Sequence, residues 1–196
     1  PIGVRLRDAA EAVAAGADEI DMVINRGAFL AGREDEVAEE IREVRSTVHP
    51  AHLKIILETG ELGNYDAIRR ASDLAMEAAA SVGPIRDGEV FIKTSTGKVK
   101  VNATLAAAEI MLTTILDMGV KDSVGFKPAG GVKTASDAKA YLDLADRLLG
   151  ADWADTRHFR CLSTCLLATT TPRCTRYHQP AGIVDIRGAG QHEACA

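Results

Sequence analysis

The chain has 196 residues, a net charge of −5 and 26% charged residues, a size typical of one domain with a sizeable core. This composition gives no basic surface for nucleic acid or for an anionic membrane. No apolar run reaches the length of a membrane span, and no signal-peptide pattern opens the sequence, so we expect a soluble, cytoplasmic protein.

Helical and strand patterns alternate along the first 160 residues. Apolar positions at helical spacing predict helices over residues 6–15, 34–48, 65–80, 102–118 and 134–149. Short apolar runs predict buried strands over 20–24, 53–57, 90–92 and 124–126, and a last strand is expected to begin at Phe159. Corresponding strand residues lie 36, 36, 34 and 33 positions apart, which is the length of consecutive βα units in a parallel sheet.

Two α/β architectures accommodate about five such units. An open doubly wound sheet would be complete with about five strands. A (β/α)8 TIM barrel typically needs about 250 residues, and here it would lack its first strands. The chain opens on a helical pattern after Pro1, which favours the barrel, so we expect an incomplete (β/α)8 TIM barrel.

The composition changes near Arg160, where regular periodicity stops. All four cysteines follow this point: Cys161, Cys165, Cys174 and Cys195. We therefore expect a partial barrel domain over residues 1–160 and an atypical, poorly structured tail over 161–196. The spacing of three of these cysteines and His178 matches no compact zinc pattern, so we expect no metal.

Two lysines, Lys93 and Lys127, each follow a short apolar run. A buried strand end disfavours a charged ammonium, and a second positive charge about 5 Å away would lower a lysine pKa by about 2 units. One of the pair would then be neutral near pH 7 and able to add to a carbonyl. The alternative is that both lysines extend along the surface to solvent.

Two carboxylates accompany this pair. Asp21 lies inside an apolar strand, where a carboxylate is costly unless it is paired. It is either a core aspartate bonded to backbone amides or a lysine, or a proton-relay group. Glu58 ends the next strand, and we expect a supporting or turn role for it.

Two glycine-containing turns follow the lysine strands. Residues 95–98 lack the glycine and the hydroxyl that a Walker motif requires, and no G-x-G-x-x-G sequence follows any strand. A nucleotide or dinucleotide cofactor is therefore not expected. A phosphate could still rest on the backbone amides of these turns.

Four sequence segments resemble deoxyribose-phosphate aldolase. They are 16–24 (GADEIDMVI), 58–62 (ETGEL), 91–98 (FIKTSTGK) and 125–131 (GFKPAGG), and the resemblance extends from about Arg5 to Arg160. It implies a class I aldolase on a TIM barrel, without metal or other cofactor. Such enzymes reversibly cleave 2-deoxy-D-ribose 5-phosphate to D-glyceraldehyde 3-phosphate and acetaldehyde, in deoxyribonucleotide catabolism.

The resemblance also assigns site residues. Lys93 matches the Schiff-base lysine, Lys127 the lysine that lowers its pKa, and Asp21 the proton-transfer aspartate. The phosphate is expected at a set of turn residues: Thr96, Gly97, Lys98, Gly130, Gly131 and Ser163. The implied partner is a small phosphorylated sugar, with neither nucleic acid nor membrane, and a homo-oligomer is left open.

The chain departs from the family pattern at both ends. The family has about three further βα units before residues 16–24, and after Arg160 its glycine is replaced by Leu162. We expect a reading frame that is cut at its start and disturbed near Arg160. The alternatives to an active aldolase are therefore an inactive aldolase fragment and a non-catalytic, flavodoxin-like module that binds a phosphorylated ligand.

Overall fold

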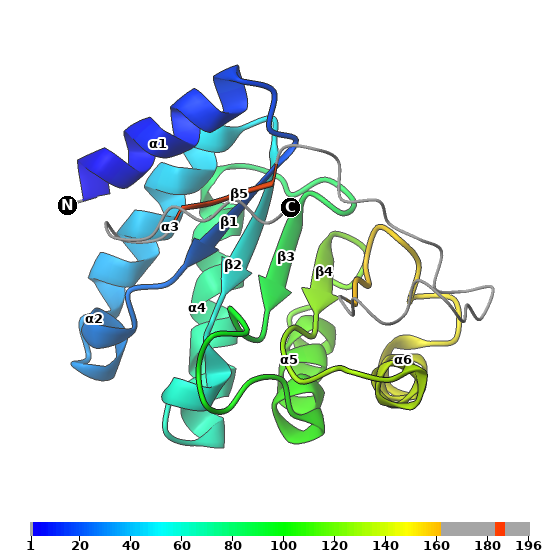
Figure 1. Ribbon diagram of the computed structural model, residues 1–196. Helices are drawn as coiled ribbons and strands as arrows, with labels where there is room; N and C mark the ends of the chain where they lie inside the picture. Colours follow the sequence, from blue (N-terminus) through cyan, green and yellow to red (C-terminus); the bar gives the residue numbers. More distant parts are fainter. Residues whose placement is uncertain (1, 162–182, 187–196) are drawn as a thin grey trace.

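The computed structural model describes residues 2–161 and 183–186. Its helices are α1 (Ile2–Ala14), α2 (Arg26–Leu30), α3 (Glu34–Val48), α4 (Tyr65–Val82), α5 (Leu105–Asp117) and α6 (Ala135–Leu149), with a 3₁₀ turn η1 (Thr59–Glu61). Its strands are β1 (Glu19–Val23), β2 (His52–Ile56), β3 (Val90–Lys93), β4 (Val124–Lys127) and β5 (Ile183–Ile186). Figure 1 shows these elements in colours that follow the sequence.

The strands form one parallel sheet in the order β4-β3-β2-β1-β5. From β1 to β4 each strand lies beside the next one in the chain, and no reversal of strand order occurs as it does in a doubly wound sheet. Helices α3, α4, α5 and α6 pack against one another in the same sequence (Figure 1). This arrangement confirms the expected α/β fold, part of a (β/α)8 barrel.

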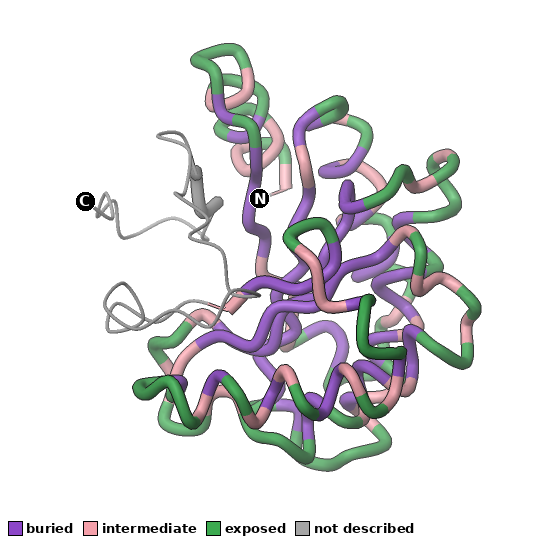
Figure 2. The backbone as a smooth tube through the Cα atoms, turned by 90° about the vertical axis from the view of Figure 1, so that its right-hand side faces the viewer, coloured by how far each residue is buried: buried purple, intermediate pink, exposed green. Residues whose placement is uncertain are grey.

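The two faces of the sheet differ in character because successive side chains on a strand point in opposite directions. On β1, Ile20 and Met22 join the hydrophobic core that the sheet shares with the helices. Ile92 of β3 and Phe126 of β4 lie in the same core. Strands β1 to β4 are almost wholly buried, and Figure 2 shows that exposure is concentrated in the loops and on the helices. The other face of the sheet carries the charged residues described below.

Helix starts on the carboxyl side of the sheet are fixed by side-chain caps. The side chains of Asn64, Thr104 and Thr134 each accept a hydrogen bond from a backbone amide in the first turn of the helix that follows. Because Thr104 has extended backbone angles, α5 begins at Leu105 and not at residue 102 as expected. These caps set the positions of the loops that connect strand ends to helices.

A close contact between β3 and β4 depends on a glycine. A β-carbon built on Gly125 would lie 2.3 Å from the ring of Phe91, so the ring occupies the space that a side chain would need. The guanidinium of Arg160 lies 4.2 Å from the centre of the same ring, an attractive cation–π arrangement. Gly125 is therefore required for space on the charged face of the sheet.

The structure differs from expectation after α6. The strand expected at Phe159 is reduced to a single bridge with Phe126, because Asp155 accepts hydrogen bonds from the backbone amides of Arg157 and His158 and holds a turn just before it. A strand that was not expected, β5, lies within the segment 161–196. The division into residues 1–160 and 161–196 stays a prediction.

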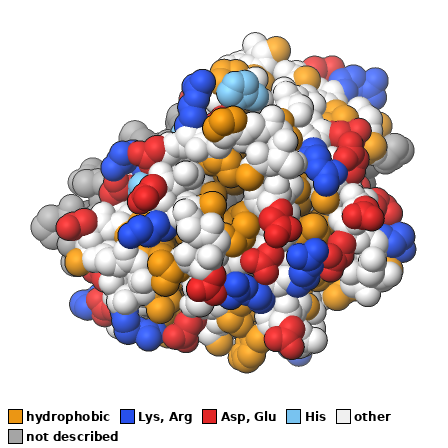
Figure 3. Space-filling view, turned by 180° about the vertical axis from the view of Figure 1, so that it is seen from behind, with side chains coloured by type: hydrophobic (Ala, Val, Ile, Leu, Met, Phe, Trp, Pro, Cys, Tyr) orange, Lys and Arg blue, Asp and Glu red, His pale blue; other side chains and the backbone are white. Residues whose placement is uncertain are grey.

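The surface described by the structure carries both signs of charge. Figure 3 shows Lys and Arg side chains interspersed with Asp and Glu side chains on the face seen from behind. Within the described residues, no helix has the length and apolar character needed to cross a bilayer.

Candidate active site

Five charged side chains gather on the face of the sheet that points away from the helices. Strand alternation places them there: Glu19 and Asp21 from β1, Lys54 from β2, Lys93 from β3 and Lys127 from β4. Each side chain is less than a tenth exposed. We call these five residues the charged cluster. The structure thus brings together the three catalytic residues expected from the sequence.

Asp21 lies between two lysines. Its Oδ1 accepts a hydrogen bond from Lys54 Nζ at 2.7 Å, and its Oδ2 accepts one from Lys93 Nζ, also at 2.7 Å. Burial raises the pKa of Asp21, but the positive charges of Lys93, Lys54 and Lys127 outweigh burial and lower the pKa to about 2. Asp21 is therefore an anion at neutral pH that is hydrogen-bonded to two lysines, and its role in proton transfer stays a prediction.

Lys127 has a different environment from Lys93, its neighbour in the register of β3 and β4. Among the described residues, no carboxylate forms an ion pair with Lys127, whereas Asp21 pairs with Lys93. Burial lowers the pKa of Lys127, and the charges of Lys93 and Lys54 lower it further, to about 7. Near pH 7 about half of the Lys127 side chains are therefore neutral.

The expected neutral lysine is therefore present, but the lowered pKa lies on Lys127. The resemblance gave Lys127 the role of lowering the pKa of Lys93. In the structure Lys93 is held in an ion pair by Asp21, because both oxygens of that carboxylate face lysines from neighbouring strands. Burial and repulsion from the other lysines together lower the pKa of Lys127.

The sequence analysis missed Lys54, the most deeply buried of the lysines at 1% exposure. Lys54 Nζ lies 2.9 Å from Glu19 Oε1 in addition to its bond with Asp21. Glu19 in turn forms an ion pair with Arg160. A signal was available in the sequence, because Lys54 is the second residue of a five-residue apolar run just as Asp21 is. Opposite charges at matching places of neighbouring strands indicate a pair across the sheet.

The two glycine turns meet beside the charged cluster. A β-carbon built on Gly97 would lie 3.9 Å from the Cα atom of Gly130. Gly97, Gly130 and Gly131 have φ angles of 84°, 76° and 80°, a left-handed conformation that favours glycine. Of the remaining residues expected at a phosphate, Thr96 and Lys98 lie in the first turn, and Ser163 lies outside the described residues.

Glu58 holds the first glycine turn in place. Its carboxylate accepts hydrogen bonds from Thr96 N at 3.1 Å and from Thr96 Oγ1 at 2.6 Å. The Ser95 hydroxyl accepts a hydrogen bond from Gly97 N and donates one to Asn102 Oδ1. Glu58 therefore supports the turn, as expected. These contacts shape a backbone loop directly after Lys93.

Known proteins with the same arrangement are aldolases. The chain aligns with QR15, an aldolase, at 28% identity and a TM-score of 0.64, over 82% of this chain and 62% of that one. It aligns with a candidate deoxyribose-phosphate aldolase from Coccidioides immitis at 28% identity and a TM-score of 0.64, over 83% of this chain and 55% of that one. A candidate deoxyribose-phosphate aldolase from Toxoplasma gondii ME49, in its apo form, aligns at 26% identity and a TM-score of 0.70, over 81% and 59%.

The chain thus spans less than two thirds of the length of these structures. The model of the DeoC/LacD family aldolases matches residues 3–151, which include β1 to β4 and the whole charged cluster. That match covers about three quarters of the chain, so the protein belongs to the DeoC/LacD aldolase family.

Proposed function

We propose that this protein acts as a class I aldolase that cleaves 2-deoxy-D-ribose 5-phosphate into D-glyceraldehyde 3-phosphate and acetaldehyde, a step in deoxyribonucleotide breakdown. The observation that carries the proposal is the arrangement of Lys93, Asp21 and Lys127 in one buried cluster, with a pKa of about 7 for Lys127. Family membership supports aldol chemistry. A steady-state assay tests which sugar phosphate the protein cleaves.

In the proposed reaction, Lys93 Nζ adds to the aldehyde carbon C1 of the open-chain sugar, and loss of water gives a protonated imine. A base removes the proton of the C3 hydroxyl as the C2–C3 bond breaks. The electron pair of the broken C2–C3 bond passes into the imine and leaves an enamine on Lys93. Release of D-glyceraldehyde 3-phosphate, protonation of the enamine at C2 and hydrolysis of the imine then give acetaldehyde.

The electrostatics of the cluster support this division of roles. Lys93 must lose a proton before it can attack, and Asp21 is a poor acceptor because its pKa is about 2. Lys127 is the better acceptor, since its pKa of about 7 leaves a large neutral fraction at physiological pH. In the proposal Asp21 orients Lys93, and Lys127 takes up and returns protons, directly or through water.

The phosphate of the substrate is proposed to bind where the two glycine turns meet. The turns at Gly97 and at Gly130 and Gly131 are adjacent, and their glycines carry no side chain that would keep a phosphate away from the backbone. Lys98 is exposed on the first turn and adds a positive charge. The substrate would then extend from the turns to the buried lysines.

Reductive trapping tests the reaction. The protein is incubated with acetaldehyde and sodium borohydride, and the modified peptide is mapped by mass spectrometry. We expect the ethyl adduct on Lys93, loss of the adduct in Lys93→Met, and a retained adduct with slower formation in Lys127→Met. The exposed Lys139, which pairs with Asp143 on α6, gives the matched control Lys139→Met, which should trap at the wild-type rate.

The trapping result also separates the alternatives. An adduct on Lys127 that survives in Lys93→Met would contradict the assigned nucleophile. A folded protein that binds 2-deoxyribose 5-phosphate with equal affinity in the wild type and in Lys93→Met, and that forms no adduct, would instead be a phosphate-ligand binding module. A steady-state assay for released D-glyceraldehyde 3-phosphate completes the test of substrate.

A further inference from the structure

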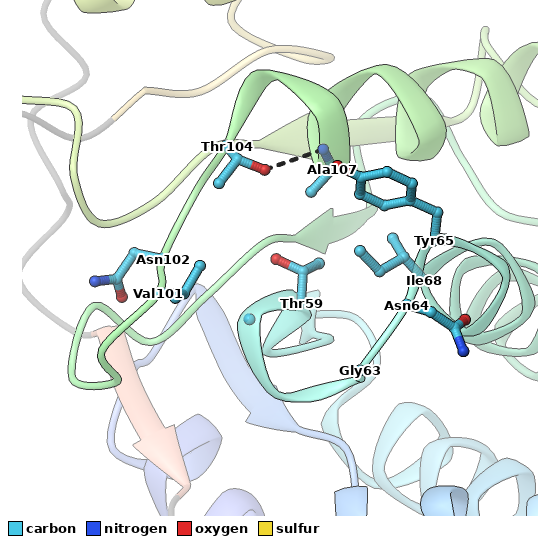
Figure 4. A pocket seen from close by; sticks show the side chains of 10 residues that line it. Thr59, Gly63, Asn64, Tyr65, Ile68, Val101, Asn102, Thr104 and Ala107 are labelled. Atoms are coloured by element: carbon cyan, nitrogen blue, oxygen red, sulfur yellow. Dashed lines mark hydrogen bonds between the residues drawn. The ribbon is translucent and has the colours of Figure 1, made fainter.

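A pocket lies outside the charged cluster, between the N-terminal ends of α4 and α5. Its volume is about 220 Å³. Its lining comes from η1, from the starts of the two helices and from the loop before α5: Thr59, Gly60, Gly63, Asn64, Tyr65, Ile68, Val101, Asn102, Thr104 and Ala107. Figure 4 shows the Thr59 side chain between Val101 on one side and Ile68 on the other.

The Thr59 hydroxyl is the unusual group in this pocket. Thr59 is 5% exposed, and its Oγ1 has no hydrogen-bond partner in the described part of the chain. Its backbone amide is used, since Thr59 N donates to Thr94 O at 2.9 Å. Buried hydroxyls in native proteins nearly always have a partner. A buried, unpartnered hydroxyl on a residue that lines a cavity is therefore a candidate contact for a bound molecule.

The rest of the lining determines which molecules fit. None of the ten lining residues carries a charged side chain, so an ion entering the pocket would lose hydration without gaining a counter-charge. Ile68 and Ala107 give the pocket apolar walls and are 4% and 3% exposed. Tyr65 and Val101 line it from positions that are exposed to solvent. The lining thus favours an uncharged, mainly apolar ligand.

The walls of the pocket are already fixed by hydrogen bonds. Asn64 Oδ1 accepts from Ala67 N at 2.8 Å, and Thr104 Oγ1 accepts from Ala107 N at 3.1 Å. Asn102 Nδ2 donates to Val99 O at 3.0 Å. These cap and loop bonds occupy polar groups that could otherwise bind a ligand. Among the described lining residues, the Thr59 hydroxyl stands out as the buried side-chain group that has no partner.

We propose that this pocket binds a small uncharged molecule made of a single ring or a short chain with one hydroxyl or carbonyl group, which exchanges a hydrogen bond with Thr59 Oγ1. The volume agrees with this size, because an apolar protein cavity of about 150 Å³ accepts benzene. The site is separate from the charged cluster, which lies on the other face of the sheet, and the proposal does not depend on the proposed function.

A pair of probes of equal size tests the proposal in the whole chain. Phenol and toluene differ only in a hydroxyl against a methyl group, and benzoate adds a charge. In two-dimensional amide NMR titrations, we expect phenol to shift the signals of Tyr65, Ile68 and Ala107 in a saturable way. Toluene should bind about three- to ten-fold more weakly, the range for one uncharged hydrogen bond, and benzoate should cause no saturable shift.

The variant Thr59→Val removes the hydroxyl and keeps the shape of the side chain. Because Oγ1 makes no hydrogen bond with any residue that the structure describes, this change breaks none of the described bonds. We expect Thr59→Val to abolish the preference for phenol over toluene. Thr47 on α3, whose hydroxyl donates to Glu43 O, gives the matched control Thr47→Val, which should keep the wild-type preference.

A second variant tests the location. Ala107→Leu places a larger side chain in the pocket, and it should weaken phenol and toluene alike while circular dichroism shows a folded protein. The proposal is overturned if phenol shifts no pocket signals, if phenol and toluene bind the wild type equally, or if Thr59→Val retains the preference for phenol.

Discussion

The carboxyl ends of β3 and β4 have similar sequences but different electrostatics. Each strand runs from valine to a lysine, and Lys93 and Lys127 lie side by side in the register. Lys93 donates to Asp21 at 2.7 Å, whereas Lys127 has no ion pair among the described residues and its pKa is lowered to about 7. The local pattern therefore places a lysine at each strand end, and Asp21 of β1, two strands away from β3, pairs with only one of them.

The comparison shows how one carboxylate can separate two lysines. Asp21 offers two oxygens, and both are taken by Lys54 and Lys93. Lys127 is left without a carboxylate partner among the described residues, and burial together with the positive charges of Lys93 and Lys54 lowers its pKa. Such a pair of unlike lysines suits chemistry that needs a nucleophile held in position and a proton acceptor that works near pH 7.

Removal of the Asp21 carboxylate, which distinguishes Lys93 from Lys127, should have the largest effect on stability. Asp21→Asn removes the anion that Lys54 and Lys93 share, and we expect the free energy of unfolding to fall by about 3–5 kcal/mol. Urea denaturation at pH 7 measures the loss. Asp143→Asn on α6, which breaks an exposed pair with Lys139, should cost less than about 1 kcal/mol. Equal losses in the two variants would show that the cluster is not held by Asp21.

Removal of the unpaired lysine should change the pH dependence of stability. The pKa of Lys127 is about 7 in the folded state, against an ordinary lysine value of 10.5, so the unfolded chain binds more protons between these values and folding stability rises with pH across that window. Lys127→Met should be more stable than the wild type below pH 7, by a few kcal/mol. Above pH 7 this difference should shrink.

Urea denaturation from pH 6 to pH 10 measures that difference. The exposed Lys139 on α6 provides the control, since Lys139→Met should follow the wild type at every pH. Parallel curves for the wild type and Lys127→Met between pH 7 and pH 10 would contradict the lowered pKa and remove the contrast between the two strand ends.

The smallest expected effect concerns the glycine turn after β4. Gly131 has a φ of 80°, and a β-carbon there meets no atom closer than 3.8 Å, so Gly131→Ala should cost about 1–2 kcal/mol through backbone strain alone. At the proposed phosphate turn it should also raise the KM for 2-deoxyribose 5-phosphate several-fold, with little change for unphosphorylated 2-deoxyribose. Steady-state kinetics with both sugars separates these effects.

Gly119, just after α5, is the matched control because its φ is 69° and a β-carbon there meets nothing within 4 Å. Gly119→Ala should cause a similar loss of stability and leave both KM values unchanged. If Gly119→Ala raised the KM for the phosphorylated sugar as much as Gly131→Ala does, the effect would arise from stability and not from the turn.

The regular part of the fold could be predicted because local patterns are strong there. The helix over 34–48 was predicted to the residue, since an acidic first turn precedes a stripe of buried apolar residues. The short helix α2 was missed because five residues hold too little periodicity. Strand β5 was missed because its pairing with β1 joins residues more than 150 positions apart, and such pairing leaves no local signal.

The candidate site was predictable in its members and less so in its electrostatics. Lys93, Lys127 and Asp21 stand out because charges are rare in apolar runs, and the structure brings them together. Lys54 meets the same criterion as Asp21, since it also lies inside an apolar run, and it is missing from the residues expected at the site. The assignment of the lowered pKa to Lys127 depends on which lysines Asp21 faces, and this follows from strand register. Local sequence does not contain that information.

The contact between Gly125 and Phe91 has a consequence for how this sequence can change over time. The Phe91 ring fills the space beside Gly125 and supports the guanidinium of Arg160, so a larger residue at position 125 requires a smaller one at 91. A smaller residue at 91 would in turn leave Arg160 without its aromatic surface. Positions 91, 125 and 160 should therefore vary together, and related sequences that differ at one of them should differ at the others.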